Sequence, residues 1–457
     1  MLFSPDDPRP VHFMGIAGAG MSALALIARR RGVPVTGCDT DPRNAADVIQ
    51  AGARVVQGHD PAHVAGTRAV VYTAAVSQAH PELEAARAAG VPAVPRAEAL
   101  NAICRGTVLA VAGTHGKTTT TVMATEALAA AGRHPTGIAG GRVAAWGGNA
   151  RVDGDGLFVV EADEYAKSFL ALHPEVAVVT NVEADHLECY GSLEALEDAF
   201  VEFAGRARRV LIGADDPGAR RVARRLRIPP WRVGLDPQAD ILIHDVRPDR
   251  AGSSARLRFP DGAMVELRLG VPGLHNVRNA AMALGAVAAL GVAPAAGLAA
   301  LAGFGGVGRR FERLGAARGV TVVDDYAHHP SEVRATLAAA RERFPDHRLV
   351  AVFQPHLYSR TQALGAELGQ ALAAADLAVV TEIYPAREQP IAGVTGEAVA
   401  AAAQAVGARV EWVPDRRALP SRLAGLVADG DVVLTLGAGD ITEVGPELLR
   451  RLTGAAA

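Results

Sequence analysis

The feature that most constrains the fold is an alternation repeated along the chain. Short apolar runs rich in β-branched residues alternate with longer stretches rich in alanine and leucine over most of the 457 residues. Short continuous apolar runs indicate strands buried on both faces, and the stretches between them have the length of helices. Parallel strands need such crossover helices, which cover both faces of the sheet. The sequence therefore predicts an α/β fold.

The alternation falls into three blocks, which predict domains at residues 1–107, 108–306 and 307–457. Between Asp240 and Gly270 polar and apolar residues alternate instead, which predicts a small antiparallel sheet in the second block. Predicted helices include Met21–Arg31 and Pro81–Gly90. The predicted strands are Val11–Ile16, Val33–Gly37, Arg54–Val56, Ala69–Ala74, Val108–Ala112, Leu157–Val160, Val176–Thr180, Val320–Val323, Leu349–Phe353, Leu377–Thr381 and Val432–Leu436.

Composition and charge exclude several classes of protein. Hydrophobic residues make up 49% and charged residues 21%, as in folded globular proteins, and a net charge of -3 gives no basic footprint for nucleic acid. We expect no membrane insertion, because the apolar runs are too short to cross a bilayer. The first ten residues lack a secretion signal, and the three cysteines lack disulfide or metal-ligand spacing. These features favour a cytoplasmic protein, and none of them indicates an oligomeric state.

The strongest local motif follows the first strand of the second block and precedes a helix. It reads Gly113-Thr114-His115-Gly116-Lys117-Thr118-Thr119. In such a loop, backbone N–H groups bind phosphate, the lysine reaches the outer phosphates and the first hydroxyl ligates Mg²⁺. The strict pattern has glycine where this chain has Val111, so the loop is a shortened variant. Lys117 and Lys167 are the only two lysines, and only Lys117 stands where a phosphate loop requires one.

Polar side chains also follow two other strands of the second block. Glu161 and Glu164 come directly after one strand, and the segment Asn181–His186 follows the next. Carboxyl ends of parallel strands share one edge of a sheet, where ligands bind, so we expect these groups near the phosphate loop. Either cluster alone would also fit a solvated loop. Together with the loop they predict a magnesium site for phosphoryl transfer.

A glycine-rich turn follows the first strand of the first block. It comprises Gly15 to Ser22, including Gly18, Ala19, Gly20 and Met21, and Asp39 follows at the distance of a ribose-binding acid. The turn predicts a site for a pyrophosphate but does not identify the nucleotide. Taken alone, it also fits a turn without a ligand or an NAD-dependent oxidoreductase.

Three segments of the third block are dense in polar groups after strands. They are Gly308–Glu312, Asp324–Pro330 and Gln354–Thr361. Ser331, directly after Pro330, is predicted to cap a helix. Arginine, histidine and paired aspartates at consecutive strand ends predict a second ligand-binding edge.

In their order along the chain, these motifs resemble the Mur ligase family. The series is VHFMGIAGAGMS, VAGTHGKTTTT, VEADE, TNVEADH, GLHNVRN, GRRFE, DDYAHHPSE, FQPHLYSRT and GAGDIT. The resemblance runs from His12 to Ile441. It implies a Rossmann-like N-terminal domain that binds a UDP-sugar, a central ATPase domain, and a Rossmann-like C-terminal domain on the amino-acid side of the cleft.

The resemblance also implies the reaction and the residues that carry it. In the alanine-adding branch, an ATP- and Mg²⁺-dependent enzyme joins the lactyl carboxylate of UDP-N-acetylmuramate to L-alanine through an acyl phosphate, for peptidoglycan synthesis. Implied metal ligands are Thr118, Glu161 and His186. Implied contacts to adenine and phosphates are Asn276, Asn279 and Arg310. Implied catalytic residues are Lys117, Glu161, His186, Arg310, His328 and His356. Implied substrate contacts are Gly18, Ala19, Gly20, Met21, Ser22, Asp39, Thr73, Tyr358 and Arg360.

Some positions depart from the family pattern. Many relatives have aspartate where this chain has Ala166, and some have arginine where Leu357 stands. Sister ligases that add later residues carry a carbamylated lysine, whose position falls near Phe200 in a chain with no lysine after Lys167. This favours the alanine-adding branch. The nearest rival is a recycling ligase that attaches a whole tripeptide, and a P-loop ATPase that drives motion is a more distant one.

Overall fold

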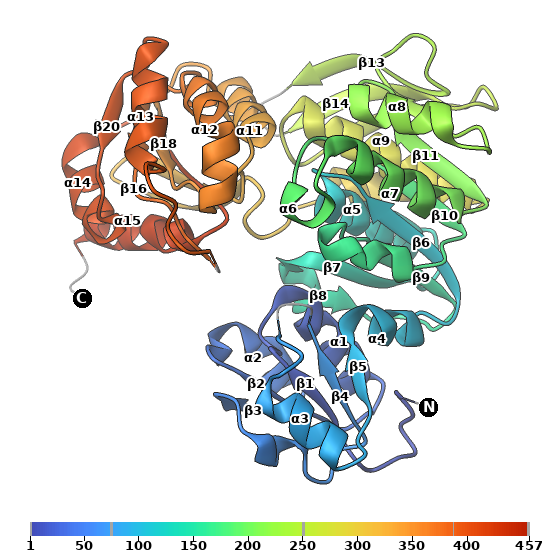
Figure 1. Ribbon diagram of the computed structural model, residues 1–457. Coiled ribbons are helices and arrows are strands. Elements are labelled where there is room, and N and C mark those ends of the chain that lie inside the picture. Colours follow the sequence, from blue (N-terminus) through green and yellow to red (C-terminus); the bar gives the residue numbers. More distant parts are fainter. Residues whose placement is uncertain (1, 74–75, 249–251, 387, 455–457) are drawn as a thin grey trace. The chain divides into compact units, whose positions relative to one another are not determined.

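The structure is a computed structural model that describes residues 2–73, 76–248, 252–386 and 388–454. The chain forms two compact units. The first comprises Met1–His244, Arg256–Leu267 and Arg278–Gly303. The second comprises Asp245–Ala255, Arg268–Val277 and Phe304–Ala457. Three sheets with covering helices make up these units (Figure 1).

The N-terminal sheet has five strands in the order β3-β2-β1-β4-β5, and its pairs are parallel. The order reverses between β1 and β4, which creates the kind of switch point where α/β sheets bind ligands. The strands are β1 (Val11–Met14), β2 (Val35–Asp39), β3 (Arg54–Gln57), β4 (Ala69–Tyr72) and β5 (Ala93–Pro95). The helices are α1 (Ala19–Arg30), α2 (Ala46–Gln50), α3 (Pro81–Ala88) and α4 (Arg96–Ile103).

The central sheet has ten strands in the order β15-β14-β13-β12-β11-β10-β6-β9-β7-β8. Its middle strands are parallel, and β8 is antiparallel to β7 at one edge. The strands are β6 (Thr107–Ala112), β7 (Thr136–Val143), β8 (Gly148–Arg151), β9 (Leu157–Glu161), β10 (Val176–Val179), β11 (Arg209–Gly213), β12 (Trp231–Gly234), β13 (Ile241–Pro248), β14 (Ser253–Arg258) and β15 (Met264–Leu269). The helices are α5 (Lys117–Ala130), α6 (Leu187–Tyr190), α7 (Leu193–Gly205), α8 (Pro217–Arg225), α9 (Leu274–Ala289) and α10 (Leu298–Ala302).

The C-terminal sheet has six strands in the order β16-β17-β21-β18-β19-β20, and only β16 is antiparallel to its neighbour. The strands are β16 (Glu312–Ala317), β17 (Val320–Asp325), β18 (Leu349–Phe353), β19 (Leu377–Val380), β20 (Val410–Trp412) and β21 (Val432–Leu436). The helices are α11 (Pro330–Arg343), α12 (Tyr358–Leu372), α13 (Gly396–Ala405), α14 (Leu419–Leu426) and α15 (Val444–Thr453).

The core of each sheet follows from its apolar strands. Every residue of β10, β18 and β21 is buried, as expected for parallel strands covered on both faces. Phe169 adds an aromatic cluster beside α7, where it stacks on Phe203 at 5.0 Å and meets Phe200 edge to face at 5.3 Å. Burying each such ring contributes roughly 1.5–3 kcal/mol. This packing anchors the segment that follows Glu161 to the core.

The predicted α/β fold is confirmed, with differences of detail. Strands β13, β14 and β15 extend the central sheet at its edge, where a separate small sheet was expected. Ala74, the predicted end of β4, lies outside the described residues. Ser331 does not cap α11. His329 caps it instead, because its ring accepts a hydrogen bond from the Ser331 amide at 3.4 Å. In turn, the His329 amide donates to the Glu332 carboxylate at 3.3 Å.

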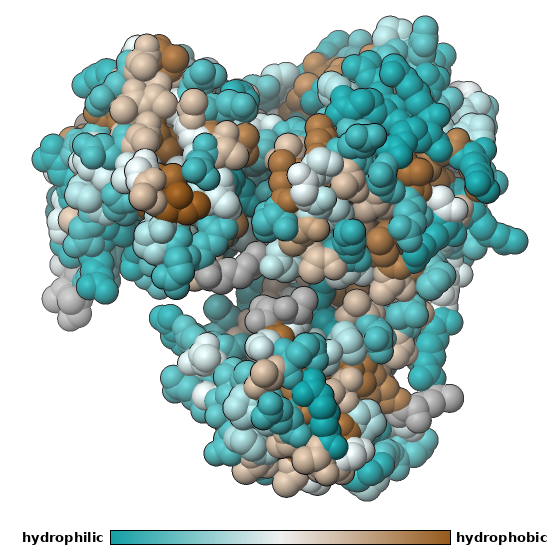
Figure 2. Space-filling view, viewed as in Figure 1, coloured by the Kyte–Doolittle hydropathy of each residue, from teal (hydrophilic) through white to brown (hydrophobic). Residues whose placement is uncertain are grey.

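On the face drawn in Figure 2, hydrophilic residues predominate and hydrophobic residues lie among them in small groups. Among the described helices, none combines the length and the apolar character needed to cross a membrane.

Candidate active site

Two glycines fix the loop between β6 and α5. Gly113 and Gly116 adopt φ values of 131° and 79°, which side chains rarely tolerate. A Cβ at Gly113 would lie 2.0 Å from the Thr180 hydroxyl, and one at Gly116 would lie 2.4 Å from Oδ1 of Asn279. The backbone can therefore turn here only with glycine at both positions. The same contacts place Asn279, from α9, directly against the loop.

Lys117 lies inside this turn. Its ammonium donates to the carbonyls of Gly113 at 2.6 Å and Thr114 at 3.1 Å, and to the Glu164 carboxylate at 2.9 Å. Burial opposes the charged form, but the carboxylates of Glu164, Asp163 and Glu161 outweigh it and raise the pKa of Lys117. The loop thus holds a permanently protonated amine among backbone groups.

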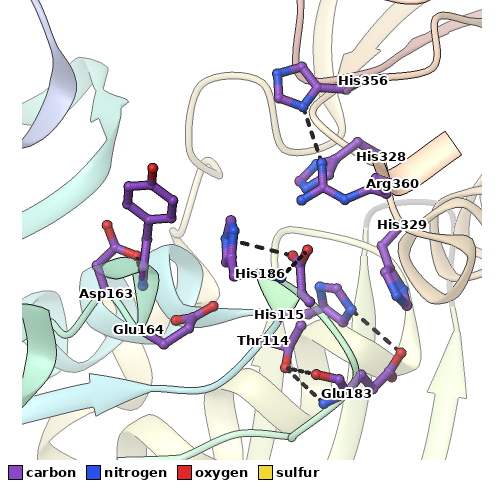
Figure 3. A network of polar contacts seen from close by, with 12 residues as sticks. Thr114, His115, Asp163, Glu164, Glu183, His186, His328, His329, His356 and Arg360 are labelled. Carbon is purple, nitrogen blue, oxygen red and sulfur yellow. Dashed lines mark hydrogen bonds and ion pairs between the residues drawn. The ribbon is translucent and has the colours of Figure 1, made fainter. Parts of the chain in front are cut away.

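The segment after β10 supports the loop from the other side. Asn181 accepts the His115 amide at 2.8 Å and donates to the His115 carbonyl at 3.1 Å. The Glu183 amide donates to the Thr114 hydroxyl at 2.8 Å, and the Glu183 carboxylate lies 3.7 Å from the His115 ring. Figure 3 shows Thr114 and His115 beside Glu183. The predicted convergence of the phosphate loop and the Asn181–His186 segment at one sheet edge is therefore observed.

The beginning of α5 fits a phosphate group. The first amides of any helix lack partners within it, and Gly116, as N-cap residue, has no side chain with which to cap them. The helix dipole favours an anion at the same point. Thr118 and Thr119 are buried in this first turn, which puts a hydroxyl beside the phosphate position. The donors match a phosphate group, and the hydroxyl oxygen is a ligand of the type Mg²⁺ prefers.

The two other predicted metal ligands lie at separate strand ends. Glu161 ends β9 and accepts the Gly140 amide at 2.5 Å. His186 has φ 53°, lies 3.4 Å from the Glu188 carboxylate and meets the Tyr165 ring edge to face at 5.2 Å. Among the described residues, neither belongs to a cluster of side chains close enough to share an ion. Their role as metal ligands stays a prediction.

Two predictions concern positions further along the central domain. Asn276 is buried and donates to the Pro272 carbonyl at 2.7 Å, so its amide is engaged within its own segment. Phe200, the position corresponding to the carbamylated lysine of sister ligases, is fully buried in the aromatic cluster with Phe169. Its surroundings are apolar and suit a phenyl ring.

The glycine turn after β1 is closed by Asp39. One carboxylate oxygen accepts the Ala17 amide at 3.0 Å and the other accepts the Asp41 amide at 3.0 Å. The carboxylate therefore holds the turn in shape, besides any contact with a ribose. Met21 and Ser22 are buried in α1, and their amides donate to the Gly18 carbonyl at 3.0 and 2.8 Å. Thr73 packs its methyl group over Gly15.

Two side chains that the sequence analysis missed link this turn to the central sheet. Asn149, in β8, donates to the carbonyl of Ala19 at 3.1 Å. Arg96, the first residue of α4, lies against Gly20 and forms an ion pair with Asp163 at 3.7 Å. No local pattern marks these residues, since each contact joins segments more than fifty positions apart. They connect the predicted sugar-nucleotide turn with the acidic segment that holds Lys117.

In the second unit, the polar segments meet at the carboxyl ends of β17, β18 and β21. Arg309 donates to Asp324 at 3.1 Å and to the Gly437 carbonyl at 2.6 Å, which fastens two loops together. Arg309 and Arg310 both lie over the Tyr326 ring at 4.9 Å, and Arg310 also lies 3.5 Å from Glu332. The two side chains are similarly exposed, at 27% and 31%.

A cluster of imidazoles and cations lies beside Arg310. Nδ1 of His328 donates to the Tyr326 carbonyl at 2.9 Å, and the His328 ring lies 5.9 Å from that of His356. His356 stacks on Tyr384 at 5.7 Å. It also contacts the Arg360 guanidinium at 3.1 Å, as drawn in Figure 3. Tyr358 begins α12 beside them. The predicted second edge is thus assembled from three separate segments.

Asp325 is buried beneath this edge. Burial raises the pKa of its carboxyl to about 6, although Arg310 and the amides of Phe311 and Ala327 lower it. The two amides donate at 2.7 and 2.8 Å, so the carboxylate positions both loops.

Comparison with known protein families finds a match for the chain of each of the three sheets. Residues 10–107 match the Mur ligase family catalytic domain, residues 111–287 the Mur ligase middle domain, and residues 309–439 the Mur ligase glutamate ligase domain. The UDP-N-acetylmuramate--L-alanine ligase of Kineococcus radiotolerans is 48% identical over 97% of this chain and 96% of its own. This chain belongs to the Mur ligase family. That confirms the family resemblance found in the motifs.

Other Mur ligases are also similar to this chain in sequence or in structure. The Streptomyces coelicolor UDP-N-acetylmuramate--L-alanine ligase is 47% identical, covering 97% of both chains. The crystal structure of UDP-N-acetylmuramate-alanine ligase from Thermotoga maritima has a TM-score of 0.83 at 30% identity, covering 98% of this chain and 100% of its own. A murein peptide ligase from Psychrobacter arcticus has a TM-score of 0.73 at 25% identity, covering 98% and 100%.

Proposed function

We propose that this Mur ligase joins L-alanine to UDP-N-acetylmuramate at the expense of ATP, in peptidoglycan precursor synthesis. The observation that carries the proposal is the clamped phosphate loop, with Lys117 held by Glu164, in a chain that is 48% identical to a ligase of this name. The C-terminal edge, with Arg310, His328, His356, Tyr358 and Arg360, supplies the groups for the amino-acid side. We assign the domains to 1–107, 108–306 and 307–457, because each span accounts for one sheet apart from Thr107, which begins β6.

The reaction begins when the lactyl carboxylate of the sugar attacks the γ-phosphate of ATP. ADP leaves, and an acyl phosphate forms. The amine of L-alanine then attacks the acyl carbon, and phosphate departs as the amide forms. The role of the protein is to position these groups and to stabilise negative charge as it develops.

Residues of the central domain carry the phosphoryl transfer. The amides of the loop and of α5 bind phosphate oxygens, and Lys117 counters their charge while Glu164 keeps it protonated. Thr118, Glu161 and His186 are the proposed ligands of Mg²⁺, which when bound would neutralise phosphate charge. Asn276 and Asn279 are the proposed contacts to adenine, and Asn279 lies against Gly116 of the phosphate loop.

Residues of the other sheets position the two remaining substrates. The glycine turn after β1 and the first turn of α1 are the proposed position for the pyrophosphate of the UDP-sugar, and Asp39 keeps that turn closed. In the C-terminal sheet, Arg310 is the proposed partner of the phosphates, and Arg360 and His356 are the proposed partners of the alanine carboxylate. The reactants are cytoplasmic metabolites, so a cytoplasmic location is part of the proposal.

The test is release of ADP by the purified chain. Steady-state ADP release should require UDP-N-acetylmuramate, L-alanine and Mg²⁺ together, and mass spectrometry should find the sugar increased by one alanine residue. Replacement of alanine by the tripeptide L-alanyl-γ-D-glutamyl-meso-diaminopimelate separates the recycling ligase. Faster turnover with the tripeptide than with L-alanine, or ADP release without any sugar, would refute the proposal.

A further inference from the structure

A second group of ligand-type side chains lies in the N-terminal sheet, away from the phosphate loop. His12 is in β1, Cys38 in β2, His63 in the turn Pro61–Val64, and Glu82 in α3. One donor atom from each of these four lies within 4.8 Å of the others. Nothing in the proposed ligase reaction uses them.

The distances are those of a compact coordination site. The Cys38 sulfur lies 3.4 Å from Nε2 of His12 and 3.3 Å from Oε1 of Glu82. His63 Nδ1 lies 2.7 Å from Oε1 of Glu82, and His12 Nε2 lies 4.0 Å from the same oxygen. Ligand bonds of about 2.0–2.3 Å around tetrahedral zinc give edges of about 3.3–3.6 Å, so these spacings need adjustments of about half an ångström.

Burial and charge favour a dication at this place. The side chains of Glu82 and His12 are 0% and 2% exposed, and His63 is 22% exposed, which leaves an entry path from the surface. One carboxylate and one thiolate together carry two negative charges. A divalent cation therefore makes the buried group electrically neutral, whereas isolated charges are costly to bury.

Neighbouring groups hold the ligands in the required orientation. Nδ1 of His12 contacts the Thr36 hydroxyl at 3.0 Å, which turns Nε2 toward Cys38, and such secondary bonds are typical of metal-bound histidine. The Asp60 amide donates to Glu82 at 3.1 Å. His59 stands beside the four, 3.2 Å from the Cys38 sulfur.

We propose that His12, Cys38, His63 and Glu82 bind a structural Zn²⁺ ion. Binding replaces the S–H bond of Cys38 by a zinc–sulfur bond, and the proton leaves to solvent. No oxidation or reduction takes place. Zinc binds cysteine, histidine and carboxylate ligands, and a site closed by four protein ligands is structural rather than catalytic.

The site also connects to the proposed substrate turn. The Cys38 carbonyl accepts the amides of Gly15 at 2.8 Å and Ile16 at 3.1 Å. A metal at the Cys38 sulfur would fix the backbone that anchors the glycine turn. Zinc-loaded protein should accordingly bind UDP-N-acetylmuramate more tightly than stripped protein, an effect that rests on the proposed function.

The experiment uses the full chain, stripped with a chelator, and two probes. Zn²⁺ is titrated against a competing indicator dye, and Co²⁺ is followed by absorption spectroscopy. We expect one ion per chain and a thiolate-to-cobalt charge-transfer band, which arises only from cysteine. The matched pair of variants is Cys38→Ala and Cys104→Ala, because both cysteines are buried in the same unit and only Cys38 lies in the cluster.

The expected results are specific. Cys38→Ala should lose the charge-transfer band and bind Zn²⁺ at least about 10²-fold more weakly, beyond the loss seen for secondary contacts, while Cys104→Ala matches the parent. Zn²⁺ should raise the melting temperature of the parent but not of Cys38→Ala. His63→Ala, at the exposed rim, is a second variant with the same predicted loss of affinity should Cys38→Ala fold poorly. A cobalt spectrum without the thiolate band, or unchanged Zn²⁺ affinity in both variants, would overturn the zinc site and leave the ligase proposal untouched.

Discussion

Replacement of Lys117 by arginine tests the phosphate loop most directly. The ammonium group has three donors, and it gives them to the Gly113 carbonyl at 2.6 Å, the Thr114 carbonyl at 3.1 Å and the Glu164 carboxylate at 2.9 Å. Arginine keeps the charge but is a larger planar fork, which cannot reach three acceptors arranged around a single nitrogen. The side chain must therefore leave the loop or distort it.

The expected fall in turnover follows from the loss of one positioned group that stabilises negative charge in the transition state. We expect turnover to fall by about 10²-fold or more, equivalent to about 2.7 kcal/mol in the activation free energy. The assay is ADP release at saturating ATP, UDP-N-acetylmuramate and L-alanine. The melting temperature and the affinity for UDP-N-acetylmuramate are measured alongside, since the sugar is expected on another sheet and its binding should change little.

Lys167→Arg is the matched control, because Lys117 and Lys167 are the only two lysines of the chain. Lys167 is exposed, and its ammonium lies 5.6 Å from the centre of the Tyr190 ring, a contact that arginine also makes. We expect this variant to retain near-normal turnover. If a folded Lys117→Arg protein turns over as fast as Lys167→Arg, Lys117 does not act on the phosphates.

Three other predictions address the metal, the pH dependence and the backbone. Glu161→Ala and His186→Ala should each raise the Mg²⁺ concentration for half-maximal ADP release, with little change in UDP-N-acetylmuramate affinity; the reverse pattern would contradict their assignment. Burial raises the pKa of Asp325 from 3.8 to about 6, so its stability contribution is present at low pH and lost as pH rises from about 4 to about 6, by about 3 kcal/mol. Asparagine does not ionise, so the melting temperature of Asp325→Asn should rise relative to that of the parent as pH rises through this window, whereas parallel curves would contradict the raised pKa. Ala166 has φ 51°, so Ala166→Gly should stabilise the protein by about 1 kcal/mol, while Ala401→Gly inside α13 should destabilise it by a similar amount in thermal unfolding.

What the sequence predicted best were features set by local patterns. The phosphate loop could be found because its spacing and its place between a strand and a helix are both local. The convergence of Glu161 and the Asn181–His186 segment on one edge followed from parallel strand order alone. The edge of the third sheet, with Arg310 and the histidine segments, was predicted on the same ground.

Contacts between distant segments could not be predicted in this way. Arg96 meets Asp163 across more than sixty positions, and no periodicity marks either residue for the other. Cysteine spacing gave no metal signal, because the partners of Cys38 are one histidine in β1, another in a turn and a glutamate in α3. The cap of α11 was assigned to Ser331 from residue preference, whereas the imidazole of His329 makes that bond. In each case the deciding term is the packing of elements remote in sequence.

Backbone strain gives a last, independent indication of where function resides. Four of the ten described non-glycine residues with positive φ fall in the site motifs: His186, Arg309, Phe311 and Leu357. Such conformations cost on the order of 1–3 kcal/mol each and persist only where the surroundings impose them.

Leu357 shows how this strain is maintained. Its φ of 70° lets its amide donate to the Tyr384 carbonyl at 3.0 Å, which draws the His356 segment toward the ring that His356 stacks on. Glycine would adopt this backbone more easily, but Leu357 is buried, with an exposed fraction of 4%. Burial of a leucine contributes roughly 1.5–3 kcal/mol, enough to offset the strain. The burial of the Leu357 side chain thus offsets its backbone strain. The strained turn in turn brings His356 to the edge of the sheet.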